Sequence, residues 1–428
     1  MKYKIQTLGC KVNQFETQAL ETMLKARGVV PAGESESADV VIVNTCAVTA
    51  ESGRKSRQAI RRIEGENPGA VVAVCGCYAQ ISPDDVAALG VAVVHGSGDK
   101  TKFADDILAA LCEKKTVEYT DDPFSRRVME ELPGGAVDGR TRAMLKIEDG
   151  CVNFCTYCVI PYARGRVRSP PPERCSAQAG ELSAEGFREL VVTGIEIASY
   201  GKDLEPTCTL ADAIEAIAGA SGEMRIRLGS LEPTVVTEDF CQRLKATGKV
   251  CDHFHLSLQS GCDRTLKNMN RKYDTARFYE SVCLLREAFP DCGLTCDLIV
   301  GFPGETEEDH RASLDFIRKC GFSAVHVFPY SKRPGTKAAD MPGHLPNAVK
   351  AARASDAQTV ADEAETEYLR ACVGKTLPVL FEREEDELSI GHASNYTQVC
   401  VHKGHLRKLV ENVKITGIID KMLVGKIV

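Results

Sequence analysis

The sequence predicts an α/β protein in three parts: an N-terminal doubly wound parallel sheet, a central partial (β/α)6 barrel and a small C-terminal β-barrel. Three observations predict this fold class. Short β-branched runs alternate with helical patterns up to about residue 370, which is typical of parallel sheets covered by helices. A polar stretch rich in Pro and Gly interrupts this alternation at residues 121–139. From residue 371 onward the chain shows short β-like runs.

Length and composition indicate a globular protein with more than one domain. The chain has 428 residues, of which 43% are hydrophobic and 26% charged, enough for two or three cores. We find no apolar run of membrane-spanning length and no signal-peptide pattern, so we expect a cytoplasmic protein with no membrane partner. In that compartment 19 cysteines indicate metal ligands and reduced core thiols. The net charge of -7 argues against indiscriminate nucleic-acid binding but allows a local basic surface.

Residues 1 to about 120 predict a parallel sheet whose strands each lead into a helix. The expected strands are residues 3–8, 40–44, 71–74 and 91–95, and the expected helices are 18–25, 52–64, 84–89 and 103–113. Ligands of doubly wound sheets bind in the crevice outside the carboxyl ends of the strands. Functional residues of the N-terminal part are therefore expected directly after each strand.

Residues 140–370 predict an open barrel of six β/α units. The expected strands are residues 143–147, 190–193, 225–228, 253–258, 295–300 and 324–328. The expected helices are 175–184, 210–218, 239–245, 275–288 and 307–320, followed by a connecting helix at 347–370. Active-site groups of such barrels come from the carboxyl ends of the strands.

The last segment predicts a small barrel, an architecture that often holds oligonucleotides. The β-like runs are residues 376–381, 388–393, 397–402, 412–416 and 426–428. One loop between two runs gathers basic side chains, namely Lys403, His405, Arg407 and Lys408, and Tyr396 lies nearby. Basic residues supply phosphate affinity and an aromatic ring can stack a base, with an ordinary solvated loop as the equal alternative.

Three cysteines stand close together after the first strand of the central part. Cys151, Cys155 and Cys158 have the spacing C-x3-C-x2-C. Soft thiolates select iron–sulfur clusters, zinc or copper(I), and a closed zinc site needs a fourth protein ligand. This loop resembles that of the radical S-adenosylmethionine (SAM) enzymes, in which the open iron of a three-cysteine cluster binds SAM and generates a 5′-deoxyadenosyl radical. The alternatives are a zinc knuckle or a chance grouping.

That resemblance implies that the neighbouring strand-end loops hold SAM. Glycine allows a close backbone approach, and hydroxyl, amide and carboxylate groups bind ribose and amino groups. The expected contacts are Gly194, Glu196, Ser230, Glu232, Ser257, Gln259 and Gly301. Each of these could instead be an ordinary turn residue.

Three strand ends of the N-terminal sheet carry cysteines as well. Cys10, Cys46 and Cys77 follow different strands, so they should converge although they are far apart in the sequence. Three thiols again predict an iron–sulfur cluster with an open iron, the alternative being three unrelated strand-end cysteines. Cys75 rivals Cys77, because residues two apart on a strand point to the same side.

Arginines follow the central cysteine loop in the segment Arg164-Gly165-Arg166-Val167-Arg168. If substrate enters over that loop, these guanidinium groups are expected to hold phosphates bidentately near the reacting atom.

Along nearly the whole chain the motifs resemble the methylthiotransferases, radical SAM enzymes with an N-terminal cluster domain and a C-terminal TRAM barrel. The matching stretches are residues 7–13 (TLGCKVN), 43–46 (VNTC), 76–80 (GCYAQ), 151–158, 255–261 (HLSLQSG), 269–271 (MNR) and 301–306 (GFPGET). The resemblance implies a cluster domain at 1–120, a linker at 121–139, a radical SAM core at 140–370 and a TRAM RNA-binding domain at 371–428. It also implies two 4Fe-4S clusters, adds Arg271 to the SAM contacts, and selects Cys77 over Cys75 because the family's third ligand follows Gly.

Within this family, the motif Leu-Gly-Cys-Lys-Val-Asn resembles the branch that forms the 2-methylthio derivative of N6-threonylcarbamoyladenosine next to the anticodon of tRNA. In the implied reaction one cluster generates the radical that takes hydrogen from C2 of the adenine, and the other supplies a sulfur that a second SAM methylates. The implied partners are tRNA, a reducing electron donor and a sulfur donor. The chain departs from the family at Glu148, where Gln is usual, at Cys262, and at the prolines after Ser169.

The alternatives within the family modify isopentenyladenosine in tRNA or an aspartate of a ribosomal protein. Two further rivals come from other classes. A binding module with structural clusters would function without Cys155, and a radical SAM enzyme of another reaction type would lack the second cluster.

Overall fold

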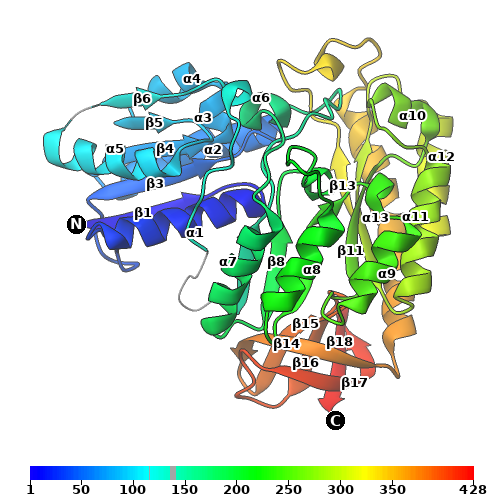
Figure 1. Ribbon diagram of the computed structural model, residues 1–428. Helices are drawn as coiled ribbons and strands as arrows, with labels where there is room; N and C mark the ends of the chain where they lie inside the picture. The colour runs from blue at the N-terminus through cyan, green and yellow to red at the C-terminus, as the bar shows by residue number, and fades with distance from the viewer. Residues whose placement is uncertain (115, 135–140) are drawn as a thin grey trace.

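The computed structural model describes residues 1–114, 116–134 and 141–428. Two α/β parts and a closed β-barrel follow one another along the chain, and the barrel lies at the end of the molecule farthest from α6 (Ile160–Arg164) (Figure 1). The predicted fold class is confirmed. No helix in the described part of the chain combines the length and apolar character needed to cross a bilayer.

The N-terminal part is a parallel sheet with the strand order β2-β1-β3-β4-β5-β6. Its strands are β1 (Lys2–Thr7), β2 (Val30–Pro31), β3 (Val40–Thr45), β4 (Val71–Gly76), β5 (Val93–His95) and β6 (Val117–Tyr119). The short edge strands β2 and β6 were not expected. The central strand β3 is buried along its whole length, which explains its continuous apolar run.

Helices cover both faces of this sheet, as expected for a doubly wound fold. One face packs against α1 (Lys11–Ala26) and α5 (Lys100–Glu113) through residues such as Leu20 and Phe103. The other face packs against α2 (Ala50–Glu66), α3 (Cys77–Ile81) and α4 (Pro83–Ala87), with Ile60 and Val86 in its core. Alternate residues of β3 enter the two cores, Ile42 one and Val43 the other, in keeping with the strand period of two.

The central part has two parallel sheets in chain order, β7-β8-β9 and β10-β11-β12-β13. The strands are β7 (Arg142–Lys146), β8 (Glu189–Thr193), β9 (Arg225–Leu228), β10 (Ser230–Leu231), β11 (His253–Gln259), β12 (Gly293–Val300) and β13 (Ala324–Pro329). Helices α7 (Pro172–Ala184), α8 (Leu210–Ala220), α9 (Glu238–Ala246), α11 (Thr275–Ala288) and α12 (Glu307–Cys320) separate them, with the shorter α10 (Asp263–Asn268) after β11. Short 3-10 turns lie at Pro123–Ser125, Ile197–Ser199, Pro233–Val235 and Lys337–Ala339.

Side chains of these strands alternate between the helix layer and the inner face of the arc. Phe254, Leu256 and Leu258 of β11 enter the large core with the helices. The intervening His255 and Ser257 therefore face inward. The strands of the open barrel thus place polar side chains such as His255 and Ser257 on the inner face of the sheet.

The C-terminal part is a closed barrel with the strand order β14-β15-β16-β18-β17. The long helix α13 (Asn347–Cys372) leads into β14 (Thr376–Glu385), β15 (Leu388–Ala393), β16 (Gln398–His402), β17 (Val410–Ile419) and β18 (Met422–Ile427). Val379, Val399 and Val413 are among the residues that fill its core. Closure removes the sheet edges that a small sheet would otherwise expose.

Buried hydrogen bonds from an arginine of the central sheet attach this barrel to the central strands. Arg227 of β9 donates two hydrogen bonds to Glu189 of β8, at 2.8 and 3.0 Å, and one to the carbonyl of Ser394 at 2.9 Å. The ring of Tyr396 lies 4.6 Å from that of His253 and 4.8 Å from the Arg227 guanidinium. The ring that we expected to stack an RNA base is thus engaged by the protein itself, a contact that no local sequence pattern signals.

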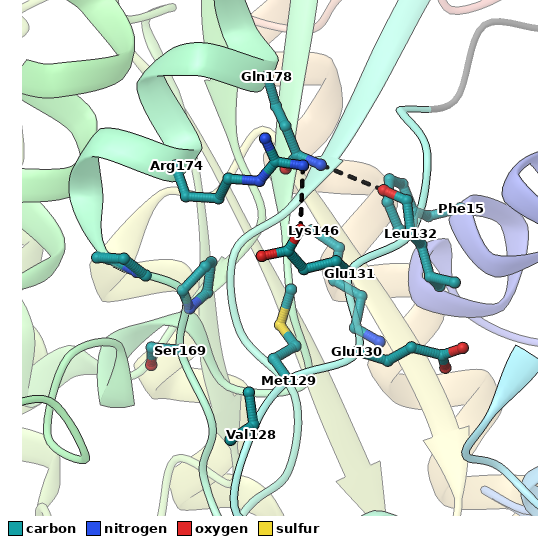
Figure 2. Close-up of a pocket in the computed structure, with 12 residues that line it drawn as sticks. Phe15, Val128, Met129, Glu130, Glu131, Leu132, Lys146, Ser169, Arg174 and Gln178 are labelled. Carbon is teal, nitrogen blue, oxygen red and sulfur yellow. Dashed lines mark hydrogen bonds and ion pairs between the residues drawn. The ribbon is translucent and has the colours of Figure 1, made fainter. Parts of the chain in front are cut away.

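The end of the described linker, around Leu132, packs against α7. Gln178 donates to the carbonyl of Leu132 at 3.2 Å, and Arg174 forms an ion pair with Glu131 at 3.2 Å (Figure 2). These residues line a cavity of about 90 Å³ that Lys146 also borders. Positions 135–139 of the linker lie outside the described residues.

Candidate active site

The three N-terminal cysteines meet at the carboxyl edge of the sheet. Cys10 precedes α1 directly after β1, Cys46 follows β3, and Cys77 opens α3 after β4. Burial raises the pKa of Cys10, and the Cys46 thiolate adds to that rise. Burial likewise raises the pKa of Cys46, with a further contribution from Cys77. Each of the three cysteines thus lies at the carboxyl end of a different parallel strand, as the sequence predicts.

Two glycines allow these loops to approach one another. Gly9 has φ +103°, and a Cβ there would lie 2.9 Å from the Sγ of Cys46. Gly76 has φ +101°, and its Cβ would lie 2.5 Å from the Oδ1 of Asn44. A side chain at either position would combine backbone strain with a clash, so glycine is required by geometry.

Asn13 joins the loops that carry Cys10 and Cys46. Its Nδ2 donates to the carbonyl of Leu8 at 2.8 Å and to that of Thr45 at 3.0 Å. The Thr45 hydroxyl in turn donates to the carbonyl of Cys75 at 2.6 Å. Satisfied buried polar groups of this kind rigidify their surroundings. Residue type alone did not signal this role of Asn13 and Thr45, although both lie inside the motifs TLGCKVN and VNTC.

Cys75 and Cys77 occupy different faces of the sheet. The expectation that they point to the same side assumed a single strand, but β4 ends at Gly76 and Cys77 belongs to α3. Cys75 lies in the core shared with α1 and α5, whereas Cys77 lies in the opposite core. Arg164 donates from Nε to the Sγ of Cys77 at 3.2 Å. This placement favours Cys77 as the third ligand.

The central cysteines occupy the loop between β7 and α6. The N–H of Cys151 donates to the carbonyl of Gly165 at 3.0 Å, and that of Cys158 to the carbonyl of Cys155 at 2.9 Å. Burial raises the pKa of Cys158 to about 12, and the thiolates of Cys155 and Cys77 add to the rise. Cys158 packs against the core that contains Cys77, which makes the two groups of thiols neighbours.

Neither group is arranged for one metal ion. Among the described residues, no three or more His, Cys, Asp or Glu side chains are placed to hold one. A cube distributes its thiolates over separate iron atoms, so its ligands stand farther apart than those of a single ion. One thiol of each group accepts a hydrogen bond from a guanidinium group, Cys77 from Arg164 and Cys155 from Arg271, and such positive surroundings suit a negatively charged, thiolate-bound cluster. The chemistry of these thiols thus suits an iron–sulfur cluster at each group.

Four of the expected SAM contacts gather beside Cys155. Arg271 donates from Nη1 to the Sγ of Cys155 at 3.2 Å, and its Nη2 lies 3.8 Å from Glu232 and 3.4 Å from the carbonyl of Ser257. Burial raises the pKa of Glu196 to about 7, and the Glu232 carboxylate adds to that rise. Two carboxylates near one guanidinium offer acceptors for ammonium and hydroxyl groups.

Glu148 holds the loop that carries Glu196 by a hydrogen bond. Its Oε2 accepts a hydrogen bond from the N–H of Glu196 at 2.6 Å. Burial raises the pKa of Glu148 well above its ordinary value, and the carboxylates of Asp149 and Glu196 add to the rise. The hydrogen bond to Glu196 needs only a side-chain oxygen that accepts, which glutamine also presents, so the departure from the family's usual Gln has a physical explanation.

The other expected SAM contacts have different surroundings. A Cβ at Gly194 would lie 2.8 Å from the Oε2 of Glu148, and one at Gly301 would lie 2.4 Å from the Cγ of Lys350 on α13. Gln259 ends β11 with φ +65°. Ser230 of β10 pairs in register with His255. Contact of these residues with SAM stays a prediction.

The arginines after the cysteine loop are placed differently from the expectation. Arg164 and Arg168 are buried, whereas Arg166 is exposed. Arg168 donates to the carbonyl of Arg164 at 2.9 Å and forms an ion pair with Asp149 at 3.3 Å. Two of the three guanidinium groups are therefore committed to contacts inside the protein and cannot hold phosphates.

Comparison with known proteins finds a family match for each of the two parts of the chain that carry these cysteines. Residues 145–317 match the Radical SAM superfamily, and residues 2–96 match the Uncharacterized protein family UPF0004. The chain is 39% identical over 404 residues to the threonylcarbamoyladenosine tRNA methylthiotransferase MtaB of Bacillus subtilis (strain 168), covering 93% of this chain and 89% of that protein. It is 34% identical over 429 residues to the tRNA-2-methylthio-N(6)-dimethylallyladenosine synthase of Thermoanaerobacter sp. (strain X514), covering 97% and 90%.

A solved structure shares the fold. The radical SAM methyltransferase TsrM from Kitasatospora setae, with tryptophan and a SAM analog bound, superposes with a TM-score of 0.57 at 17% identity over 79% of this chain and 75% of that one. At this level of identity the likeness concerns the fold alone.

Proposed function

This chain belongs to the radical SAM methylthiotransferases that act on tRNA, and on that premise we propose that it inserts a methylthio group at C2 of N6-threonylcarbamoyladenosine next to the anticodon. The observation that carries the proposal is that the central loop reaches the N-terminal thiols: Cys158 packs against the core that contains Cys77, and Arg164 donates to the Sγ of Cys77 at 3.2 Å. Two such groups side by side suit a reaction in which a radical formed at one must reach sulfur at the other.

Each group of thiols has its own proposed cofactor. Cys10, Cys46 and Cys77 would hold one 4Fe-4S cluster, and Cys151, Cys155 and Cys158 the other. When bound, these clusters and SAM supply radical generation and a transferable methylthio sulfur. Glu196 and Glu232 would bind the ammonium and ribose hydroxyl groups of SAM. Arg271 forms an ion pair with Glu232, which orients that carboxylate, and donates a hydrogen bond to the Sγ of Cys155.

The threonylcarbamoyl branch is supported by Lys11 as well as by the relatives' names. Lys11 follows Cys10, opens α1 and is exposed. A threonylcarbamoyl group carries a carboxylate that an ammonium can pair with, whereas an isopentenyl group is apolar. The isopentenyladenosine branch is the second candidate, since a relative with that type of name is 34% identical.

RNA contact and the remaining partners complete the proposal. The division into 1–120, 121–139, 140–370 and 371–428 assigns RNA binding to the C-terminal barrel as a TRAM domain. Lys403 and Lys408 are exposed on the loop between β16 and β17 and would contact phosphates. A reducing electron donor and a sulfur donor would act with the enzyme in the cytoplasm.

The test is mass spectrometry of tRNA nucleosides from cells that lack the protein, complemented with wild type or with Cys10→Ala. The proposal expects 2-methylthio-N6-threonylcarbamoyladenosine to return with wild type and to stay absent with Cys10→Ala. Return of a different methylthio nucleoside would move the chain to the isopentenyladenosine branch. No change in any nucleoside would refute tRNA as the substrate.

A further inference from the structure

Arg164 connects the two groups of thiols. It ends α6, six positions after Cys158 in the sequence, and none of its surface is exposed to solvent. Its Nε donates to the Sγ of Cys77, which belongs to the other group, at 3.2 Å. A residue from the central loop therefore holds a thiol of the N-terminal part.

The rest of this guanidinium is held by α1. Nη2 donates to the Oδ1 of Asn13 at 2.9 Å and to the Oε2 of Glu16 at 3.1 Å, and Nη1 pairs with the other carboxylate oxygen of Glu16. All three nitrogens thus have partners in the N-terminal part. A planar fork bound at every nitrogen has one orientation, which fixes the position of Nε relative to Cys77.

The surrounding charges leave a positive surplus. Around Glu16 and Asp149 the described residues place four buried cations: Arg164, Arg168, Lys146 and Lys100. Within ion-pair distance four cations face two carboxylates, the Asp121 carboxylate lying farther from Arg168, and burying unpaired charge is costly. A thiolate-bound cluster on Cys77 would supply negative charge at the place where this network lacks it.

Arg271 provides a matched arrangement at the other group of thiols. It donates to the Sγ of Cys155 at 3.2 Å and faces Glu232 at 3.8 Å. Within the described part of the chain, each group of thiols therefore receives one guanidinium hydrogen bond, and the two arginines can be compared within one protein.

We propose that Arg164 is a positioning residue of the N-terminal cluster: it holds the Cys77 thiolate, offsets the charge of the cluster and keeps the cluster against the radical-generating loop. This inference rests on the proposed function, because that function assigns a cluster to Cys10, Cys46 and Cys77. Hydrogen bonds and positive charge at the sulfur ligands stabilise the reduced, more negative state, so they raise the reduction potential.

The experiment is a redox titration of the reconstituted holoenzyme followed by electron paramagnetic resonance, with iron content measured in parallel. Arg164→Lys keeps a positive charge near Glu16 but cannot bind Asn13, Glu16 and Cys77 together. We expect it to lower the midpoint potential of the N-terminal cluster and to leave that of the 151–158 cluster unchanged. Arg271→Lys is the matched control. It should lower the midpoint potential of the 151–158 cluster and leave that of the N-terminal cluster unchanged. Signals are assigned in a background that lacks Cys151, Cys155 and Cys158.

Glu16→Gln separates the thiolate contact from the packing around it. It removes the ion pair but retains the guanidinium beside Cys77, so its N-terminal potential should not fall. Loss of about half the iron from a folded Arg164→Lys protein, with full iron in Glu16→Gln, would also support the proposal. An unchanged N-terminal potential in Arg164→Lys, or equal changes in both clusters, overturns it.

A second variant covers the case in which a buried lysine prevents folding. Arg164→Gln combined with Glu16→Gln removes both charges together, and it must lower the N-terminal potential as well; an unchanged potential overturns the proposal. The proposed function fails separately, if the wild-type protein reconstitutes with one cluster or none.

Discussion

The Oε2 of Glu148 accepts a hydrogen bond at 2.6 Å from the backbone N–H of Glu196, joining two neighbouring strand-end loops. The other carboxyl oxygen of Glu148 is buried and has no hydrogen-bond partner among the described residues. Glu148 therefore acts here as a hydrogen-bond acceptor that positions the loop of Glu196, and its charge is not needed for that role.

Substitution of Glu148 should separate these two properties. Glu148→Gln retains the acceptor, so SAM affinity should stay within about twofold of wild type. Glu148→Leu removes a buried hydrogen bond worth about 1.4 kcal/mol, which corresponds to about a tenfold loss of SAM affinity. Calorimetric titration of the reconstituted enzyme with SAM measures both. Unimpaired binding by Glu148→Leu would show that the loop is held by other contacts.

Iron analysis should distinguish Cys77 from Cys75. Cys77→Ala should lose one of the two clusters, about four of roughly eight iron atoms. Cys75→Ala is the matched control, because Cys75 lies in the opposite core, and it should keep its iron. Colorimetric iron and sulfide determination on the anaerobically reconstituted protein gives the answer, and iron loss in Cys75→Ala alone would reverse the assignment.

Lys11 should affect recognition of the modified base. Lys11→Gln removes the ammonium proposed to pair with the threonylcarbamoyl carboxylate, a charged hydrogen bond worth about 1.5–3 kcal/mol. We expect kcat/KM to fall about 10–100-fold on an anticodon stem-loop that carries N6-threonylcarbamoyladenosine. The cluster spectra should not change. An unchanged kcat/KM would remove the main structural support for the threonylcarbamoyl branch.

Glu189 should contribute to stability in a pH-dependent way. Burial alone would raise its pKa, but the Arg227 and Arg225 guanidinium groups hold the pKa of Glu189 far below its ordinary value. A lowered pKa contributes stability above the unfolded-state value of about 4.3, and this is lost at about 1.4 kcal/mol per unit as the pH falls further. Glu189→Gln leaves buried guanidinium groups unpaired and should cost about 3–5 kcal/mol at neutral pH.

Urea unfolding of the cluster-free protein at several pH values tests this expectation. The difference in unfolding free energy between wild type and Glu189→Gln should be constant between pH 7 and 5 and should shrink below about pH 4. A difference that did not depend on pH would mean that packing, and not ionisation, accounts for the role of Glu189.

The loop between β16 and β17 should contribute phosphate contacts. Lys403→Ala and Lys408→Ala should weaken tRNA binding and should each reduce the slope of log affinity against log salt by about 0.7–0.9. Lys245→Ala, an exposed lysine on α9, changes the net charge equally and serves as the control. Filter binding at several salt concentrations measures the slopes, and equal effects from all three variants would mean that the loop has no special role.

Local patterns predicted much of the fold, because hydrophobic periodicity and strand-end residues act over short stretches of chain. The strands at 40–44 and 225–228 were predicted within a residue, and Cys10, Cys46 and Cys77 were expected to converge because they follow parallel strands. The relation of Cys75 to Cys77 was predicted wrongly, since the turn at Gly76 lies between them. The short edge strand β6 carried too few residues to signal itself.

The sequence by itself determined the order of α/β units, the two groups of three cysteines and the family resemblance, because each depends on residue type and spacing. Only the tertiary structure decided which charged side chains are available to ligands. Arg164 and Glu16 lie 148 positions apart in the sequence and still form a buried pair, and Tyr396 packs on Arg227 of a distant strand. Burial and ion pairing depend on such long-range contacts, so spacing alone could not separate a phosphate-binding arginine from one that supports a thiolate.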